Sequence, residues 1–333
     1  MNPGLLMVSA SPHIRTVLDY PRAIRYVILA LIPSLLWGVY CFGGRALIIC
    51  LVSVAAALAG EAAWLALRHH PIDLGDGSAF LTGLLMGLNL PASVPAWIPA
   101  FGSLFAVVVV KQVFGGLGHN ILNPALAGRT FLTVSWPALM TAGWLRPLAG
   151  TVSGMDGISG ATPLAILKNP GWFGPVDAVI HRLNDWTTIG HCFFGNTGGS
   201  IGETSSLLLI IGGVFLLILG VTDYRIVAGY LAAFGIGAWA LYPAVNPLLS
   251  LFGGGLMLGV FFMATDWVTS PVSRTGRWIF GVGCGILTVV LRRWGSYPEG
   301  VSFAILIMNI LTPLIDRLTR ERIFGDHRKE VPA

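Results

Sequence analysis

Residues 46–67 read ALIICLVSVAAALAGEAAWLAL, and Glu61 is the one charged side chain in this apolar run of 22 residues. An α-helix needs about 20 predominantly apolar residues to cross the hydrocarbon core of a bilayer. The run therefore predicts a membrane-spanning helix. Comparable runs recur at 26–43, 205–221 and 226–249, so the sequence predicts a polytopic membrane protein of the all-α class.

The composition of the whole chain agrees with this class. Of its 333 residues, 55% are hydrophobic and 11% are charged, whereas about 25% of the residues of a soluble domain are charged. The mean hydropathy is +0.77. These values exclude a disordered chain, a nucleic-acid-binding module and a secreted disulfide scaffold. We expect no metal site, because the four cysteines form no CxxC pair: Cys41, Cys50, Cys192 and Cys284.

The apolar stretches fall into two sets of five. The first set covers 26–43, 46–67, 78–90, 97–110 and 121–140, and the second covers 205–221, 226–249, 251–265, 278–291 and 301–315. Several are shorter than a full crossing, most clearly 78–90. Short stretches of this kind predict half-helices, or helices completed by polar residues buried inside a bundle. We therefore expect about ten transmembrane helices.

The distribution of basic residues predicts the orientation of these helices. With the N-terminus in the cytoplasm, thirteen of the 20 lysines and arginines lie in inner segments and six in outer ones, as the positive-inside rule requires. Residues 1–25 then form a cytoplasmic segment without a cleavable signal, and residues 317–333 form a basic cytoplasmic tail. Residues 141–203 lie outside the cytoplasm.

Two sets of five spans, each an odd number, run in opposite orientations. This geometry predicts two inverted five-helix repeats, the first over 26–140 and the second over 204–316, both with their functional sites near the repeat interface. Weak sequence echoes favour the repeat. Asn123-Pro124 follows the start of the fifth span, and Pro298-Glu299-Gly300 opens the tenth.

The long connection at 141–203 contains the run Asp156-Gly157-Ile158-Ser159-Gly160-Ala161-Thr162. Asp-Gly and Ser-Gly pairs are typical of turns, so a surface turn without chemistry is one interpretation. The other is a hydroxyl group for chemistry, on a segment whose two glycines allow a backbone or a phosphate to approach closely. Turn chemistry alone leaves both interpretations open.

The run resembles the acceptor motif on which flavin transferases esterify FMN to a threonine. The rest of the chain resembles the family that contains the D subunit of the Rnf ion-translocating electron-transport complex and the B subunit of the sodium-pumping NADH:quinone reductase. The short segment before the first span favours the Rnf branch. The matching motifs are Ser11-Pro12-His13, Asp76-Gly77-Ser78-Ala79, residues 111–124 (KQVFGGLGHNILNP), residues 198–205 (GGSIGETS), Ala264-Thr265-Asp266 and Tyr297-Pro298-Glu299-Gly300-Val301.

The resemblance implies a flavoprotein. Thr162 corresponds to the threonine that bears FMN through a phosphoester, and the recognition residues around it correspond to Asp156, Gly157, Ser159, Gly160 and Ala161. The expected protein lies in the cell inner membrane and relays electrons within a translocase that couples ferredoxin:NAD electron transfer to Na⁺ or H⁺ translocation. Implied partners within the Rnf complex are its A and E membrane proteins, its flavin-bearing G protein, its iron–sulfur B protein and its NAD-side C protein. A flavin transferase is implied for maturation.

Polar groups within the spans are candidates for an ion path, because ionisable groups at membrane depth are costly. Glu61 and Arg129 also have structural interpretations: Glu61 faces Arg68, and Arg129 snorkels or holds a carbonyl group. Glu203 is expected to cap the sixth span, since helix N-termini favour carboxylates. The candidates for the ion path are Glu61, Asn120, Asn123, Arg129 and Asn309.

The chain lacks a dinucleotide-binding fingerprint and an iron–sulfur cysteine set. We therefore expect NAD and ferredoxin to bind to partner proteins of the complex. Two alternatives remain open: a component of the sodium-pumping quinone reductase type, and a solute channel, since the family fold is similar to that of urea transporters. The quinone-reductase relative further implies a second, non-covalent flavin, such as riboflavin, between the halves.

Overall fold

The computed structural model describes residues 19–141, 143–145, 147, 162–297 and 299–320. Within these ranges the chain is largely helical, and an isolated β-bridge joins Pro91 and Ser200. Five helices are long and apolar enough to cross a membrane: α1 (Tyr20–Phe42), α2 (Gly44–Leu67), α11 (Tyr224–Leu241), α14 (Arg274–Trp294) and α15 (Val301–Leu318). This confirms the expected polytopic all-α class.

Shorter helices occupy the other apolar stretches. Three of them are strongly apolar: α3 (Ser78–Leu88), α4 (Trp97–Leu104) with its continuation as the π-helix η1 (Phe105–Gln112), and α10 (Ser206–Ile218). The remaining stretches form α5 (Pro124–Ser135) with α6 (Pro137–Thr141), and α12 (Pro247–Phe252) with α13 (Leu256–Leu258) and the π-helix η3 (Gly259–Met263). The stretches at 121–140 and 251–265 were expected as single spans, and each is broken. Pro137 cannot donate a helical hydrogen bond, which fits the break between α5 and α6.

Side-chain caps fix where several helices begin. Asn123 accepts a hydrogen bond from Leu126 N at the start of α5, where Pro124 occupies the first turn. Ser205 caps α10 and Ser273 caps α14 in the same way. Each cap satisfies a backbone N–H that has no partner within its own helix.

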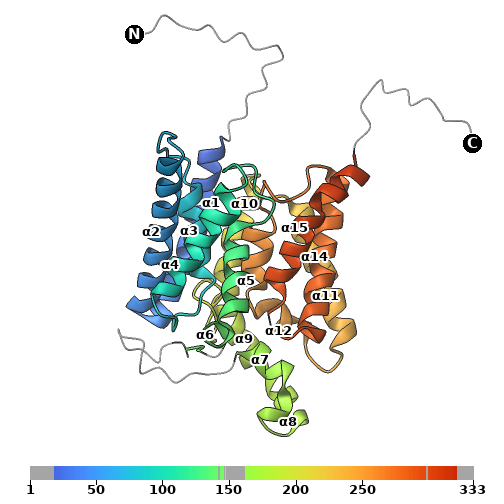
Figure 1. Cartoon of the computed structure of the whole chain (residues 1–333). Coiled ribbons are helices and arrows are strands. Elements are labelled where there is room, and N and C mark those ends of the chain that lie inside the picture. Colours follow the sequence, from blue (N-terminus) through green and yellow to red (C-terminus); the bar gives the residue numbers. More distant parts are fainter. Residues whose placement is uncertain (1–18, 142, 146, 148–161, 298, 321–333) are drawn as a thin grey trace, which may run out of the picture.

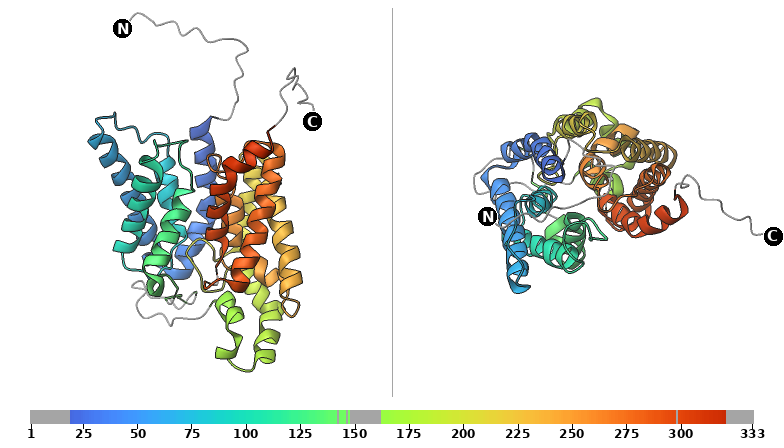
Figure 2. Two further views of the ribbon diagram at one scale, coloured as in Figure 1. Left: turned by 45° about the vertical axis from the view of Figure 1, so that its right-hand side comes forward. Right: turned by 90° about the horizontal axis from the view of Figure 1, so that it is seen from above.

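The helices form two groups that lie side by side, as the view along the bundle shows (Figure 2). The first half is residues 19–141 and the second half is residues 205–320. Within the first half α2 packs on α3 and α4, and within the second half α11 packs along α14. The halves meet where α1 lies against α10 and α5 against α15.

Glycines allow helices within and between the halves to approach closely. A Cβ atom on Gly83 of α3 would lie 2.6 Å from Val54 Cα of α2, and one on Gly281 of α14 would lie 2.5 Å from the Ile226 carbonyl oxygen of α11. Between the halves, a Cβ on Gly212 would lie 2.5 Å from the Ala30 carbonyl oxygen. Small residues at such crossings are typical of helix packing in membranes.

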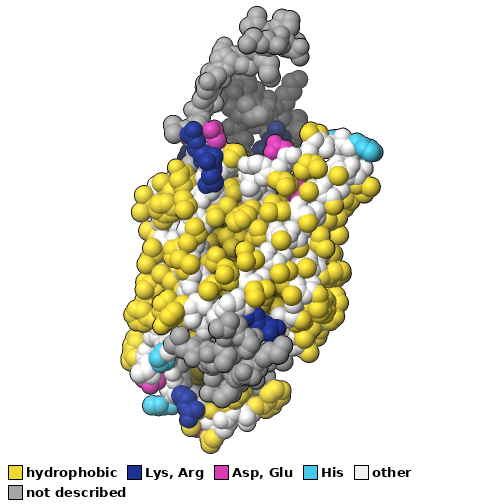
Figure 3. Space-filling view, turned by 90° about the vertical axis from the view of Figure 1, so that its left-hand side faces the viewer, with side chains coloured by type: hydrophobic (Ala, Val, Ile, Leu, Met, Phe, Trp, Pro, Cys, Tyr) yellow, Lys and Arg dark blue, Asp and Glu magenta, His cyan; other side chains and the backbone are white. Residues whose placement is uncertain are grey.

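Large apolar side chains cover the middle of the outer surface. Leu36, Leu51, Ile218, Ile236 and Ile310 are all more than half exposed. In the space-filling view, hydrophobic side chains form a broad belt and charged side chains gather toward the two ends (Figure 3). This distribution suits a lipid surrounding.

α1 begins and α15 ends at one end of the bundle, which we call the terminal end (Figure 1). Residues 162–204, the connecting segment, extend from the opposite, connecting end. The segment was expected as a loop, but it contains α7 (Pro163–Lys168), the 3₁₀ turn η2 (Pro170–Trp172), α8 (Val176–Asn184) and α9 (Trp186–Phe194). Asn184 ties it to the second half, because its side chain donates to the Ala244 carbonyl (2.7 Å) and accepts from Asn246 N (2.8 Å).

Two short helices end inside the bundle. α3 follows Gly77 (φ 75°) and α13–η3 follows Gly255 (φ 67°), so both begin after a left-handed glycine. Their C-terminal ends meet, since Asn89 Nδ2 lies 3.6 Å from Met263 Sδ. Asn123 Nδ2 donates to the Met263 carbonyl at 3.3 Å. The short stretch at 78–90 thus forms a short helix, α3, that ends at the buried polar residue Asn89.

Candidate functional site

Thr162 lies at the N-terminus of α7. Its backbone is extended (φ −69°, ψ 153°), Pro163 occupies the first turn, and its Oγ1 accepts a hydrogen bond from Ala165 N at 3.2 Å. The residue is buried, with 8% of its surface exposed. The expected recognition residues Asp156, Gly157, Ser159, Gly160 and Ala161 lie outside the described residues.

The Thr162 side chain lines a small cavity, of about 20 Å³, between the connecting segment and the second half. Two glycine-rich strips form much of its wall, Gly198-Gly199 and Gly253-Gly254. Gly254 has φ +68°, and a Cβ atom there would lie 2.8 Å from Leu164 Cδ2. Glycine is therefore required for α7 to pack this closely.

Two carboxyl groups, Glu203 and Glu299, line the same cavity. Residues 195–203 bring Glu203 there by running along α1: Trp37 Nε1 donates to the Gly195 carbonyl (3.1 Å), and Ser34 Oγ donates to the Gly202 carbonyl (2.6 Å). Glu203 Oε1 accepts from Ser200 N at 2.7 Å. Glu203 Oε2 is buried without a hydrogen-bond partner.

The expected capping role of Glu203 is wrong. Ser205, two residues further on, accepts from Leu208 N and caps α10. The carboxyl group of Glu203 instead turns back to its own loop. Oε1 of this carboxyl group accepts the hydrogen bond from Ser200 N. Oε2 faces Gly255, where an added Cβ atom would lie 2.3 Å from it.

Glu299 forms an ion pair with Arg129 of α5. Arg129 Nη1 also lies 3.3 Å from Asn89 Oδ1 and 3.3 Å from Ser302 Oγ. Arg129 therefore does not extend toward the membrane surface, and its partners are side chains and not a backbone carbonyl group. It joins two elements of the first half to the segment that begins α15 in the second half.

Two further cations lie near the cavity, and both bind carbonyl groups. Arg292 donates to the Ser250 carbonyl (2.7 Å) and the Gly253 carbonyl (3.1 Å). Lys168 donates to the Tyr297 carbonyl (3.1 Å) and to that of Gly295, just after the C-terminal end of α14. Burial lowers the pKa of Lys168. These contacts hold α7 against the second half.

Cys192 of α9 also lines the Thr162 cavity. Burial raises the pKa of this thiol to about 11. Because the thiolate is the reactive form, Cys192 is inert at neutral pH.

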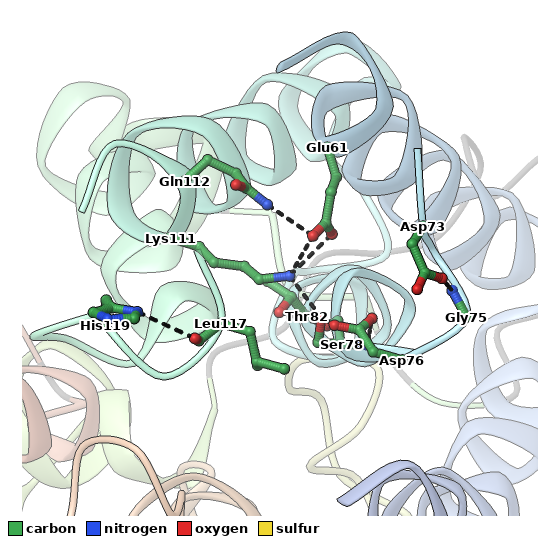
Figure 4. Close-up of polar contacts among 10 residues, drawn as sticks. All are labelled: Glu61, Asp73, Gly75, Asp76, Ser78, Thr82, Lys111, Gln112, Leu117 and His119. Atoms are coloured by element: carbon green, nitrogen blue, oxygen red, sulfur yellow. Dashed lines mark hydrogen bonds and ion pairs between the residues drawn. The ribbon is translucent and has the colours of Figure 1, made fainter. Parts of the chain in front are cut away.

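Glu61 lies in a separate polar cluster toward the terminal end (Figure 4). Lys111 Nζ contacts both carboxyl oxygens of Glu61, at 2.8 and 2.9 Å, and Ser78 Oγ at 2.6 Å. Gln112 Nε2 donates to Glu61 Oε1 at 2.7 Å. The expected contact of Glu61 with Arg68 is wrong. Arg68 instead lies over the ring of Trp64.

A larger cavity, of about 110 Å³, lies between the two halves toward the terminal end. Residues of both halves line it, including Lys111, Asn120 and Asn123 from the first and Phe262 and Asp266 from the second. Binding pockets for small molecules have few polar groups in an apolar wall, and this cavity shares that character.

The structure thus gathers some of the expected ion-path residues and separates others. Asn123, Arg129 and Asn309 all lie at the interface between the halves, where the Asn309 amide oxygen faces Asn123 N at 3.1 Å. Asn120 lies at the cavity between the halves, where its side chain donates to the Leu122 carbonyl. Glu61 lies apart, within the first half. Glu299, Glu203 and Asn89 are interface residues that were not among the expected ones.

The residues around Thr162 fit a phosphate-linked group. The hydroxyl oxygen at a helix start and the glycine-rich walls suit a phosphoester, while Lys168 and Arg292 line a neighbouring pocket on the other side of Leu164. Within the described ranges no three His, Cys, Asp or Glu side chains are grouped to hold a metal ion.

Comparisons with known proteins identify the relatives of the chain. Residues 7–325 match the model of the NQR2, RnfD, RnfE family. The chain is 43% identical to the D subunit of the Na⁺-translocating ferredoxin:NAD⁺ oxidoreductase complex of Acetobacterium woodii, covering 98% of this chain and 97% of that one. It is 40% identical to the D subunit of the proton-translocating ferredoxin:NAD⁺ oxidoreductase complex of Clostridium ljungdahlii, over 98% of each chain. It is 43% identical to the D subunit of the ion-translocating oxidoreductase complex of Stutzerimonas stutzeri, over 96% of this chain and 95% of that one.

Proposed function

The chain belongs to the NQR2, RnfD, RnfE family, and we propose that it is the D subunit of an Rnf-type ferredoxin:NAD oxidoreductase complex in which Thr162 carries FMN through a phosphoester. It is a multi-pass membrane subunit of an ion-translocating complex. The observation that carries the FMN proposal is the position of the Thr162 hydroxyl, at a helix start inside a glycine-walled cavity.

The chain's own residues would position the cofactor. FMN supplies electron-transfer chemistry when bound, and the protein sets where that chemistry takes place. Thr162 holds the phosphate end, and the glycines of the cavity wall allow backbone to approach it. Lys168 and Asn184 tie the connecting segment to the second half, so the attachment point moves with that half.

We further propose that the cavity between the halves binds a second, non-covalent flavin. Its place between the halves, its apolar wall and its amide and hydroxyl groups support this. Asn120, Asn123 and Thr82 line it and would supply hydrogen bonds to a polar ring edge. Riboflavin and other flavins share this ring.

The proposed topology places both termini in the cytoplasm and the connecting segment outside it, in the cell inner membrane. The excess of basic residues in inner segments supports this orientation. The short helices α3 and α13–η3, each starting after a left-handed glycine, support two inverted repeats that together supply about ten spans.

Electrons would reach Thr162-bound FMN through partner proteins of the complex. Ferredoxin and NAD chemistry is assigned to those partners, with flavin attachment carried out by a transferase. The ion path would use Asn120, Asn123, Arg129 and Asn309 between the halves, together with Glu61 near the terminal end. Na⁺ and H⁺ are both open as coupling ions, since the named relatives include one of each kind.

In-gel flavin fluorescence of the denatured chain tests the attachment. Wild type should fluoresce and gain the mass of one FMN less one water, and Thr162→Ala should do neither. Thr197→Ala is the matched control, because Thr197 lines the same cavity and should leave the flavin in place. Thr162→Ser retains a hydroxyl and should be partly flavinylated. Flavin that persists in Thr162→Ala would exclude the assignment.

The same assay addresses the rival function, a solute channel. A channel has no use for a denaturation-resistant flavin. Wild-type chain without covalent flavin, in cells that contain the transferase, would favour the channel.

A further inference from the structure

The carboxyl group of Glu203 has a hydrogen-bonding deficit. Only 8% of the surface of Glu203 is exposed, and Oε2 has no partner, while Oε1 has one. Ser200 Oγ, on the residue whose backbone N–H binds Oε1, is also buried without a partner. An ionised carboxylate accepts only, whereas a protonated one also donates. Among the described residues, the only hydroxyl hydrogen beside these unpartnered oxygens is that of Ser200, and no cation contacts Glu203 Oε2.

The charged groups around Glu203 do not supply its counter-charge by contact. Glu299, Arg129 and Arg292 are the ones that face it. Arg129 is engaged by Glu299, whose like charge opposes ionisation of Glu203. The terminal nitrogens of Arg292 donate hydrogen bonds to the carbonyl groups of Ser250, Gly253 and Gly254. A buried carboxylate without a paired cation is strongly disfavoured relative to its neutral form.

We propose that Glu203 is a proton-binding site at the interface between the halves, with its carboxyl group neutral in the resting protein. The bound species is a proton because a proton needs only one free oxygen, and Oε2 is the one oxygen of the carboxyl group without a partner. Na⁺ would need several oxygen ligands around it.

The site has a consequence for Thr162, and this part of the inference rests on the proposed function. Glu203 and Thr162 line one cavity. A phosphoester on Thr162 is an anion, and a second anion at Glu203 would repel it. A proton neutralises Glu203, and Arg129 pairs with Glu299. The cavity can then accept the phosphate without an unpaired negative charge beside it.

Infrared spectroscopy of the purified complex tests the proton directly. A protonated carboxyl group gives a carbonyl-stretch band that shifts in D₂O. The wild-type complex at pH 7 should show this band, and Glu203→Gln should remove it. Glu61→Gln is the matched control, because Glu61 is a buried carboxyl group that contacts a cation, Lys111. Its variant should retain the whole band.

Glu203→Asp provides a second test should Glu203→Gln fail to assemble. It keeps a carboxyl group and should move the band rather than remove it. A band that is unchanged in Glu203→Gln or Glu203→Asp would overturn the proposal. So would a band that disappears from the wild type on addition of Na⁺ at constant pH, since that result would indicate an ionised, cation-bound carboxylate.

Flavin fluorescence of the same denatured samples separates the two proposals. A Glu203 band in wild-type protein without covalent FMN supports the proton site and contradicts the proposed attachment. Covalent FMN in a wild-type complex that lacks the band contradicts the proton site alone.

Discussion

Arg129 of α5 forms an ion pair with Glu299, two residues before the start of α15, so this contact between two charged side chains links the halves of the bundle. Both side chains are largely buried, at 8% and 16% exposed. Asn89 and Ser302 complete the hydrogen bonds of Arg129 from both sides. The interface between the halves is therefore specified by polar contacts as well as by packing.

Arg129→Leu should destabilise the protein by about 3 kcal/mol, because removal of one partner strands the other charge in a buried site. Unfolding in detergent micelles, followed by circular dichroism, measures the loss. Arg129→Leu/Glu299→Gln should recover most of it. Arg225→Leu is the control: Arg225 is more exposed than Arg129, and its partner Asp223 keeps a second ion pair with Arg277, so the loss should cost less than about 1 kcal/mol. Equal losses for Arg129→Leu and Arg225→Leu would contradict the inter-half role.

Glu61→Gln should impair ion transport more than flavin content. Glu61 is paired with Lys111 near the terminal end, whereas Thr162 lies toward the other end. The measurement is ion uptake into membrane vesicles driven by reduced ferredoxin and NAD, divided by the electron-transfer rate in the same vesicles. Glu61→Gln/Lys111→Met removes both charges and tests whether an unpaired Lys111 causes the effect. An unchanged ratio in Glu61→Gln would leave Glu61 with a structural role.

A reporter active only outside the cytoplasm should be active when fused within residues 170–190 and inactive when fused after Arg322. The physical reason is the excess of basic residues in the segments assigned to the cytoplasmic side. The opposite pattern would place the connecting segment in the cytoplasm and remove the basis for the proposed topology.

Gly255→Ala should destabilise the protein by at least about 1–2 kcal/mol, the cost of a left-handed conformation for a residue with a Cβ. Its φ is +67°, and the new methyl group would also displace Glu203. Gly190→Ala serves as the control, since no atom lies within 4 Å of a Cβ there and the residue is in α9. Unfolding curves of the two variants should differ clearly. Coincident curves would show that Glu203 does not depend on this close approach.

The local apolar patterns predicted much of the fold. Residues 46–67 form a helix within two residues of the expected bounds, and the short stretch at 78–90 is the short α3. These features depend on local periodicity and length, which a sequence carries directly. The helices of the connecting segment were not predicted, because α7, α8 and η2 are short and their apolar faces are weak signals beside glycine and proline.

Side-chain partners were harder to predict than helices. Glu61 pairs with Lys111, 50 positions away, because η1 packs on α2, and no helical spacing contains that relationship. Glu203 has the sequence signature of a helix cap, yet Ser205 competes for the same role at the position where α10 begins. Thr162 was predicted through a family motif, and the structure adds the cavity into which its side chain projects.

The meeting of α3 with η3 has an electrostatic consequence. Each helix carries a partial negative charge at its C-terminal end, and the ends of these two helices converge at Asn89 and Met263. Two helix dipoles therefore create a region of negative potential deep in the bundle, far from bulk water that could screen it. Arg129, which contacts Asn89, occupies that potential well. The centre of the protein thus favours positive charge even though its acidic side chains are few.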